Sequence, residues 1–261
     1  MASKKKIEVK RDHFWNLKLF LILAVTVAAY IPAASCGFLN WDDIIYVMNN
    51  DMIKKWSGDN LVKMFSTFYM GNYHPFILLS FACDFSFFGM NAGGYHVHNI
   101  LLHVVNTFLV YAFFYFLFDK KTTPGLIVAL LFAIHPMHVE SVAWISERKD
   151  LLYTLYFLLS LTAYVFYIRK QQSKYLLFSA LLFLFSILAK AQAVTLPLVL
   201  ILIDYYLRRK ITLKTVLEKV PFFILSLVFG IVAIYAQKAD NSVNPNSIPV
   251  TSSLFYAQYS I

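Results

Sequence analysis

Two adjacent carboxylates, Asp42 and Asp43, follow directly after the first long apolar segment of the chain. Charged side chains beside a bilayer are costly unless they line a polar cavity, so acids in such places mark functional sites. An acid at this position can accept a proton from a substrate hydroxyl, coordinate a cation or bind a partner. We therefore take Asp42 and Asp43 as the candidate catalytic residues, with either one able to serve as a general base.

Other ionisable side chains occur at the ends of later apolar segments, on the same predicted side as the acidic pair. The candidates for contact with substrate or donor phosphate are His74, His98, Glu140, Arg148, Lys149 and Lys190. A single buried histidine is more often a hydrogen-bonded core residue than a ligand, but here at least four separate segments bring such groups to one side. We expect them to surround a polar cavity, in which a cation such as Arg148 or Lys149 would stabilise a phosphate leaving group.

Other kinds of chemistry have weaker support in the residue pattern. A zinc site built from His135, His138 and Glu140 has ligands at helical spacing, but Pro136 perturbs that turn. No motif for a nucleophilic serine or cysteine is present, and Gly93-Gly94 is too short for a phosphate-binding loop. We assign no metal ligands and no resident cofactor, although a divalent cation stays open.

The composition is that of a membrane protein. Hydrophobic residues make up 59% of the chain and charged residues 14%, against about 25% charged residues in soluble domains. Apolar runs long enough for a hydrocarbon core recur along it. They are Leu17–Ala34, Val97–Phe118, Pro124–Trp144, Leu151–Ile168, Tyr175–Ala189, Ala191–Leu207 and Val216–Ala236. We predict an all-α polytopic bundle of about seven transmembrane helices, with the fifth and sixth runs forming a hairpin around Lys190.

The segment before the first run and every second loop after it are basic, which gives the predicted orientation. The basic residues are Lys4, Lys5, Lys6, Lys10, Arg11 and Lys18, then Lys120 and Lys121, then Arg169, Lys170 and Lys174, then Arg208, Arg209, Lys210, Lys214 and Lys219. The positive-inside rule places these segments, including the N-terminal residues 1–16, in the cytoplasm. The formal charge of +9 therefore reflects topology. It does not indicate nucleic-acid binding, because the basic residues are dispersed.

One long connection, residues 37–96, lies between the first two predicted spans. It contains the acidic pair and two helical stretches, Asn60–Tyr69 and Phe76–Phe88, which we expect to lie along the membrane surface. Loops of this length inside compact proteins are usually functional. By the charge rule this loop is extracytoplasmic.

Ordered polar motifs give a family resemblance. Five such motifs follow one another along the chain. They are F-L-N-W-D-D at 38–43, N-Y-H-P-F at 72–76, G-Y-H-V-H-N-I-L-L-H at 94–103, H-P-M-H-V-E-S-V-A-W-I-S-E-R-K-D-L-L at 135–152 and L-A-K-A-Q-A-V-T-L-P-L-V-L at 188–200. Over residues 30–210 the chain resembles the membrane part of the transmembrane-and-tetratricopeptide-repeat O-mannosyltransferases, in a form like their bacterial relatives.

The resemblance implies a GT-C type glycosyltransferase. Such enzymes take a sugar from a polyprenyl-phosphate carrier and attach it, here to a protein Ser or Thr hydroxyl, on the outer face of the membrane. By analogy Asp42 would be the general base, with Asp43 its neighbour. The implied location is a bacterial inner membrane, with the bilayer, the carrier-linked sugar and the acceptor protein as partners.

Two departures from the family pattern accompany the resemblance. Family members continue with further spans and a repeat domain, so we expect residues 17–261 to be the N-terminal part of the membrane domain, and the activity of this chain alone stays open. Lys190-Ala191-Gln192 replaces a Lys-Pro-apolar sequence, so the role of Lys190 rests on its charge and predicted side. The alternative from another class is a non-catalytic membrane scaffold or transporter-like partner with a polar extracytoplasmic cavity.

Overall fold

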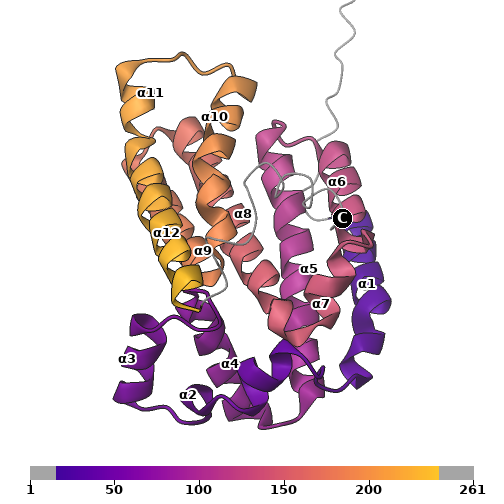
Figure 1. The fold of residues 1–261 in the computed structure, drawn as a ribbon. Helices are drawn as coiled ribbons and strands as arrows, with labels where there is room; N and C mark the ends of the chain where they lie inside the picture. The colour runs from indigo at the N-terminus through magenta and orange to yellow at the C-terminus, as the bar shows by residue number, and fades with distance from the viewer. Residues whose placement is uncertain (1–15, 241–261) are drawn as a thin grey trace, which may run out of the picture.

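The computed structural model describes residues 16–240 of the chain, and its regular elements over that range are all helices (Figure 1). The principal helices run side by side as a bundle. They are α1 (Leu17–Tyr30), α5 (Ala92–Leu117), α6 (Thr122–Ile134), α8 (Arg148–Lys170), α9 (Ser173–Ala189), α10 (Leu196–Tyr206) and α12 (Val220–Ala239). The prediction of an all-α membrane bundle is confirmed.

Shorter helices connect and cap the bundle. They are η1 (Ile31–Ser35), η2 (Ile44–Met48), α2 (Asp51–Lys54), α3 (Gly58–Ser66), α4 (Pro75–Phe88), α7 (His138–Ala143), η3 (Ile145–Glu147), η4 (Ala191–Thr195) and α11 (Leu213–Leu217). Helices α2, α3 and α4 gather at one end of the bundle, at the bottom of Figure 1, which we call the loop end. The connections α5–α6, α8–α9 and α10–α11 lie at the opposite end, which we call the basic end because it carries Lys120, Lys170 and Arg209.

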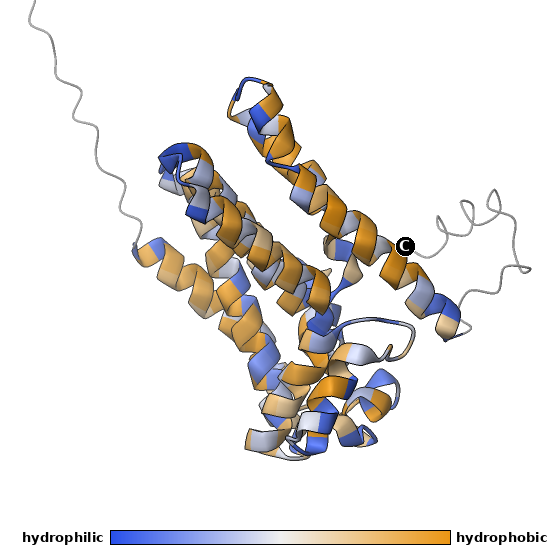
Figure 2. Cartoon of the chain, turned by 90° about the vertical axis from the view of Figure 1, so that its left-hand side faces the viewer, coloured by the Kyte–Doolittle hydropathy of each residue, from blue (hydrophilic) through white to orange (hydrophobic). Residues whose placement is uncertain are grey.

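Helix length and hydropathy identify four helical segments in the described range that are long and apolar enough to cross a membrane: Leu17–Ser35, Ala92–Leu117, Ile145–Lys170 and Leu213–Ala239. The other three predicted spans correspond to shorter apolar helices, α6, α9 and α10 with η4. Apolar side chains on the outside of the bundle, such as Leu131 on α6 and Leu227 on α12, are 60% and 67% exposed. Figure 2 shows this apolar character along the bundle helices, as expected of surfaces that face lipid.

The third predicted span, Pro124–Trp144, is wrong in its extent. Its helix ends at Ile134, and His135 takes an extended conformation (φ −65°, ψ 127°) immediately before Pro136. Proline disfavours the α conformation of the residue before it and lacks the N–H that a helix needs. The chain therefore turns here, and residues 138–143 form the separate helix α7.

Helices predicted within the long loop are present. Helix α3 begins at Gly58, where the Ser57 hydroxyl accepts a hydrogen bond from the Asn60 N–H at 3.2 Å, a standard N-terminal cap. Helix α4 begins at Pro75, a residue favoured in the first helical turn because it has no N–H to leave unpaired. The apolar hairpin around Lys190 is also present, since α9 ends at Ala189 and η4 and α10 continue from Ala191.

Small hydroxyl residues bring α8 and α9 close together. The Ser160 hydroxyl donates to the Ser179 carbonyl at 2.8 Å, and the Ser179 hydroxyl donates to the Ser160 carbonyl at 2.9 Å. Both residues are fully buried. Small polar residues allow close helix approach and hydrogen bonding inside membranes, so this pair fixes the position of α9 and of Lys190 at its end.

We expect the loop end to be extracytoplasmic and the basic end cytoplasmic. The native thiols Cys36 and Cys83 are free and exposed, so they are first replaced by Ser. Single cysteines at Asp59 and at Lys170 should then react with an impermeant maleimide only from outside and only from inside the cell, respectively. Labelling of position 170 from outside would contradict the assignment.

Candidate functional site

Asp43 ties the long loop to the bundle. Its side chain is fully buried. One carboxylate oxygen accepts hydrogen bonds from the Ser146 N–H (2.9 Å) and hydroxyl (2.5 Å), and the other accepts from the Leu39 N–H (2.9 Å). Because both oxygens are occupied by donors from residues far apart in the sequence, Asp43 positions its neighbour Asp42 relative to η3.

Asp42 remains accessible beside a lysine. Its side chain is 20% exposed, and its carboxylate lies 4.0 Å from the Lys149 ammonium. That ammonium also lies 5.1 Å from the centre of the Tyr46 ring, an arrangement in which the π face helps to stabilise the positive charge. Of the two adjacent acids, Asp42 is thus the one that an incoming substrate can reach.

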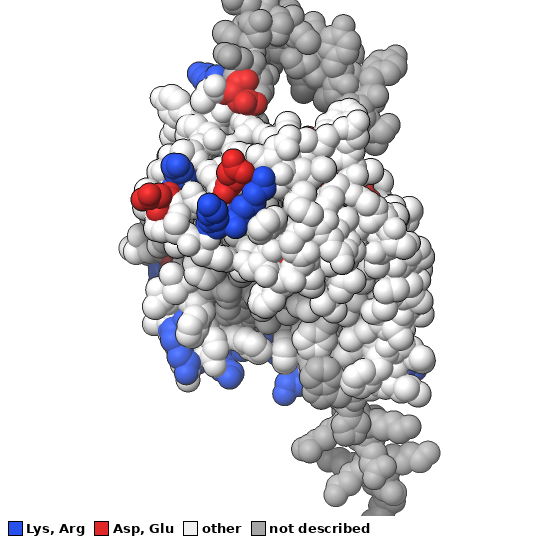
Figure 3. Space-filling view, turned by 90° about the horizontal axis from the view of Figure 1, so that it is seen from below, with Lys and Arg blue, Asp and Glu red and all other residues white. Residues whose placement is uncertain are grey.

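From Asp42, alternating charges continue across the loop end. The Lys149 ammonium lies 3.0 Å from the Glu147 carboxylate, and the other oxygen of Glu147 lies 3.5 Å from the Lys190 ammonium. The Lys190 ammonium also lies 2.5 Å from the Asp150 carboxylate. We call these five residues, Asp42, Lys149, Glu147, Lys190 and Asp150, the charged chain. Each side chain is between 11% and 29% exposed. The surface of the loop end, seen in Figure 3, carries charged side chains of both signs on a mainly uncharged background.

The positive charge of Lys190 is stabilised by its neighbours in the charged chain. Burial lowers the pKa of its ammonium, but the hydrogen bonds and charges of Asp150 and Glu147 outweigh burial and raise that pKa above its ordinary value. Lys190 is therefore a fixed cation at the junction of α9 and η4. An ammonium has three N–H donors, so a third donor remains beside those directed at the two carboxylates.

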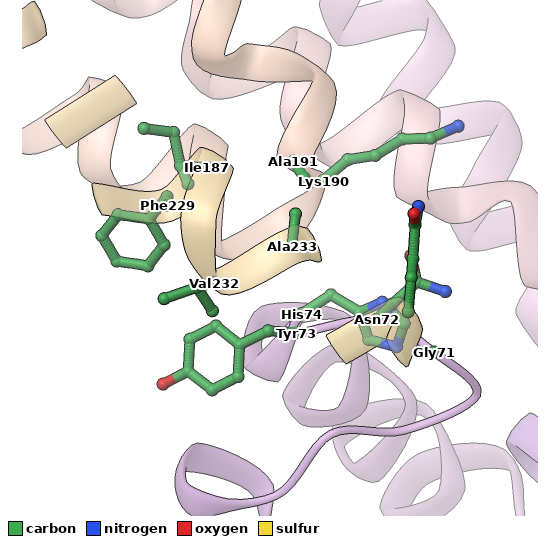
Figure 4. Close-up of a pocket in the computed structure, with 11 residues that line it drawn as sticks. Gly71, Asn72, Tyr73, His74, Ile187, Lys190, Ala191, Phe229, Val232 and Ala233 are labelled. Atoms are coloured by element: carbon green, nitrogen blue, oxygen red, sulfur yellow. The ribbon is translucent and has the colours of Figure 1, made fainter. Parts of the chain in front are cut away.

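His74 and Lys190 line the same small cavity. The cavity is lined by residues from the long loop, from the α9–η4 junction and from α12, including Asn72, Tyr73, His74, Lys190 and Phe229 (Figure 4). Burial, with the positive charges of Lys149 and Lys190, lowers the pKa of His74 to about 3. His74 is therefore neutral at physiological pH and adds no charge to the site.

Arg148 is turned away from the charged chain. It is fully buried, 2.5 Å from Asp84 on α4, and it donates to Asn99 Oδ1 at 2.7 Å and to the Tyr95 carbonyl at 3.1 Å. His98 contacts the other oxygen of Asp84 at 2.6 Å. Arg148 and His98 therefore meet in an ion-paired cluster that joins α4, α5 and α8, and this geometry gives them a structural role.

Helix geometry explains why neighbours in sequence separate here. Arg148, Lys149 and Asp150 occupy successive positions of the first turn of α8, about 100° apart around its axis. Arg148 therefore points into the core while the other two reach the charged chain. Glu140 is exposed on α7 and lies outside the charged chain.

Three acids of importance were not selected from the sequence as site residues. Glu147 and Asp150 belong to the charged chain, and Asp84 is the partner of Arg148. The available signal for Asp84 was that it is the one acid in the apolar helix α4. An acid inside an apolar helix needs a partner, and a buried cation satisfies it.

The same geometry bears on metal binding. Within residues 16–240, no group of three or more His, Cys, Asp or Glu side chains is arranged so that it could hold a metal ion. His135 and His138, weighed above as zinc ligands, have ring centres 6.0 Å apart.

Comparison with known proteins identifies the family. The family model described as "Dolichyl-phosphate-mannose-protein mannosyltransferase" matches residues 74–236, which is more than half of the chain. The chain belongs to this mannosyltransferase family. No solved structure matches it.

Curated relatives agree with the family assignment. The chain is 29% identical over 183 residues to "Protein O-mannosyl-transferase Tmtc1" of Drosophila melanogaster, covering 66% of this chain and 21% of that protein. It is 28% identical over 160 residues to "Protein O-mannosyl-transferase TMTC3" of Homo sapiens, covering 57% of this chain and 17% of that protein. It is 40% identical over 95 residues to "Protein O-mannosyl-transferase TMTC2" of Homo sapiens, covering 36% of this chain and 11% of that protein. The matched regions thus amount to about a fifth or less of these relatives' own lengths, and the predicted family resemblance is confirmed.

Proposed function

We propose that this membrane protein is a GT-C type glycosyltransferase that transfers a hexose from a polyprenyl-phosphate carrier to a protein Ser or Thr hydroxyl. The reaction is placed at the loop end, on the extracytoplasmic side of a bacterial inner membrane. The observation that carries the proposal is the charged chain. In it an accessible carboxylate, Asp42, lies 4.0 Å from the Lys149 ammonium, and Glu147 links Lys149 to the second cation, Lys190. Membership of the mannosyltransferase family supports mannose as the hexose.

Asp42 is assigned the role of general base. A Ser or Thr hydroxyl is too weak an acid to attack unaided at neutral pH, so its proton must pass to a positioned base as it reacts. The hydroxyl oxygen forms a bond to the anomeric carbon of the sugar while the bond from that carbon to the phosphate oxygen breaks. The proton goes to the Asp42 carboxylate, and the polyprenyl phosphate leaves with the electron pair. Asp43, held by Ser146 and Leu39, keeps Asp42 in place.

Lys149 and Lys190 are assigned to the carrier phosphate. Negative charge grows on the leaving phosphate oxygen during transfer, and fixed cations near it stabilise the transition state. Lys149 has one close carboxylate partner, Glu147 at 3.0 Å, since Asp42 at 4.0 Å is beyond hydrogen-bond distance. Each ammonium can therefore turn a free N–H donor towards a phosphate oxygen without leaving the charged chain.

Removing either cation should weaken binding of the bare carrier, a short-chain polyprenyl phosphate. A hydrogen bond to a charged group contributes about 1.5–3 kcal/mol. Lys149→Gln and Lys190→Gln should therefore raise the Kd for polyprenyl phosphate by about 10–100-fold. The measurement is titration of the purified protein in nanodiscs.

The matched control is Lys63→Gln, which removes an exposed lysine of α3 at the same end of the bundle. This variant should bind polyprenyl phosphate like the wild type. Wild-type affinity in both the Lys149 and Lys190 variants would remove these residues from the phosphate site.

A further inference from the structure

A second cavity is lined by residues of α5, α6, α7, α8 and η4. Its volume is about 240 Å³, several times the roughly 30 Å³ that one water occupies in the liquid. Its lining combines apolar side chains, such as Phe132 and Leu151, with several polar ones. The polar residues that line it are His103, Asn106, His138, Ser141, Asp150, Thr154 and Gln192.

Two fully buried side chains on the α5 wall of this cavity have unpartnered acceptor atoms. His103 Nε2 lies 3.1 Å from the Ala133 carbonyl, which can only accept, so Nε2 carries the proton and Nδ1 is an acceptor. Asn106 donates its Nδ2–H to the Leu151 carbonyl at 2.8 Å. Within the described residues, His103 Nδ1 and Asn106 Oδ1 are buried and have no hydrogen-bond partner. Buried acceptors without partners cost free energy, so an ordered water or a ligand hydroxyl that donates to them would stabilise this wall.

The chemistry of the lining selects a hydroxyl-rich ligand. The unpartnered lone pairs of His103 Nδ1 and Asn106 Oδ1 would repel a phosphate. The hydroxyls of Ser141 and Thr154 and the Gln192 amide can both donate and accept hydrogen bonds. A sugar, whose hydroxyls donate and accept around a ring, matches such a lining.

Asp150 connects this cavity to the charged chain. One of its oxygens lies 2.5 Å from the Lys190 ammonium, and the other accepts from the Ser141 hydroxyl at 3.0 Å within the cavity wall. A ligand with an anionic end at Lys190 and a polyhydroxyl group in the cavity would therefore occupy two adjoining sites.

We propose that this cavity binds the hexose of the carrier-linked donor, with His103 Nδ1 and Asn106 Oδ1 accepting hydrogen bonds from its hydroxyls. The inference rests on the proposed function, since it assigns the sugar and the phosphate of one donor to neighbouring sites. It makes the α5 wall and Thr154 the residues that recognise the sugar.

The test compares two ligands of equal chain length, polyprenyl phosphate and polyprenyl-phosphate-mannose, by their Kd values for the purified protein in nanodiscs. The wild type should bind the mannosylated carrier at least about fivefold more tightly, the size of one net hydrogen bond. Thr154→Val, which exchanges a lining hydroxyl for a methyl group of similar size, should reduce this preference. Asn106→Leu should abolish it, and both variants should bind the bare carrier like the wild type.

Thr162→Val is the matched control on the same helix. The Thr162 hydroxyl donates to the Leu158 carbonyl of its own helix at 2.8 Å and is not among the residues that line the cavity, so the preference should be unchanged. Equal wild-type affinity for the two ligands, or a preference that survives in both cavity variants, would overturn the sugar site while leaving the proposed function intact. Absence of binding of either ligand to the wild type would overturn the proposed function itself.

Discussion

Replacement of Asp42 by Asn is expected to lower glycosyl transfer by about 10²–10⁴-fold, the usual contribution of a general base. Asparagine keeps the size of the side chain and its ability to hydrogen bond but cannot take the proton of the acceptor hydroxyl. The Kd for the polyprenyl-phosphate donor should change much less, because the phosphate is assigned to Lys149 and Lys190. The measurement is the transfer rate at saturating donor, together with the donor Kd.

Asp59→Asn serves as the control for this prediction, because Asp59 is an exposed acid in the same loop, at the start of α3. It should retain wild-type transfer.

Asp43→Asn tests whether the two adjacent acids have different roles. This substitution should weaken the hydrogen bonds that Asp43 accepts from Ser146 and Leu39. It should therefore lower both the transfer rate and the thermal stability of the protein. Wild-type transfer by the Asp42→Asn variant would refute the general-base assignment.

Replacement of Arg148 by Met is expected to destabilise the protein by about 3–5 kcal/mol, because it leaves the buried carboxylate of Asp84 without its cation. The double variant Arg148→Met with Asp84→Leu should be less destabilised than Arg148→Met alone, since removing both partners leaves no unpaired charge. Unfolding by denaturant in mixed micelles would measure these differences.

Arg169→Met provides the contrast. Arg169 and Asp119 are 2.8 Å apart, but the Asp119 side chain is 83% exposed, so loss of this pair should cost no more than about 1 kcal/mol. A stable Arg148→Met variant that has lost carrier binding would instead support the role at the donor phosphate that the sequence suggested for Arg148.

The sequence was most informative where a pattern fixes both position and side of the membrane. Apolar runs and alternating basic loops predicted the bundle, and they predicted that Asp42, Lys149 and Lys190 lie at the same end of it. In the structure these three residues belong to one charged chain. The break at Pro136 was underestimated, because the hydropathy of residues 124–144 hides a turn that depends on proline geometry.

Side-chain direction could not be obtained in the same way. Arg148 and Lys149 are neighbours with the same charge, and only the packing of α8 against α4 and α5 decides that one is buried and the other reaches Asp42. Asp42 and Asp43 are equivalent in the sequence too. Their different environments arise because Asp43 accepts hydrogen bonds from Ser146 of η3, which is more than a hundred positions away in the sequence.

The central proposal is that the charged chain supports transfer of a carrier-linked sugar to a protein hydroxyl, rather than binding alone. The most direct test supplies the purified full-length protein, in proteoliposomes, with polyprenyl-phosphate-mannose and a threonine-containing acceptor peptide, followed by mass spectrometry of the peptide. We predict a mannosylated peptide, and none from an otherwise identical peptide with Val in place of Thr. If the wild-type protein binds the donor but leaves the threonine peptide unmodified, it is not the proposed transferase, and a non-catalytic scaffold becomes the better explanation.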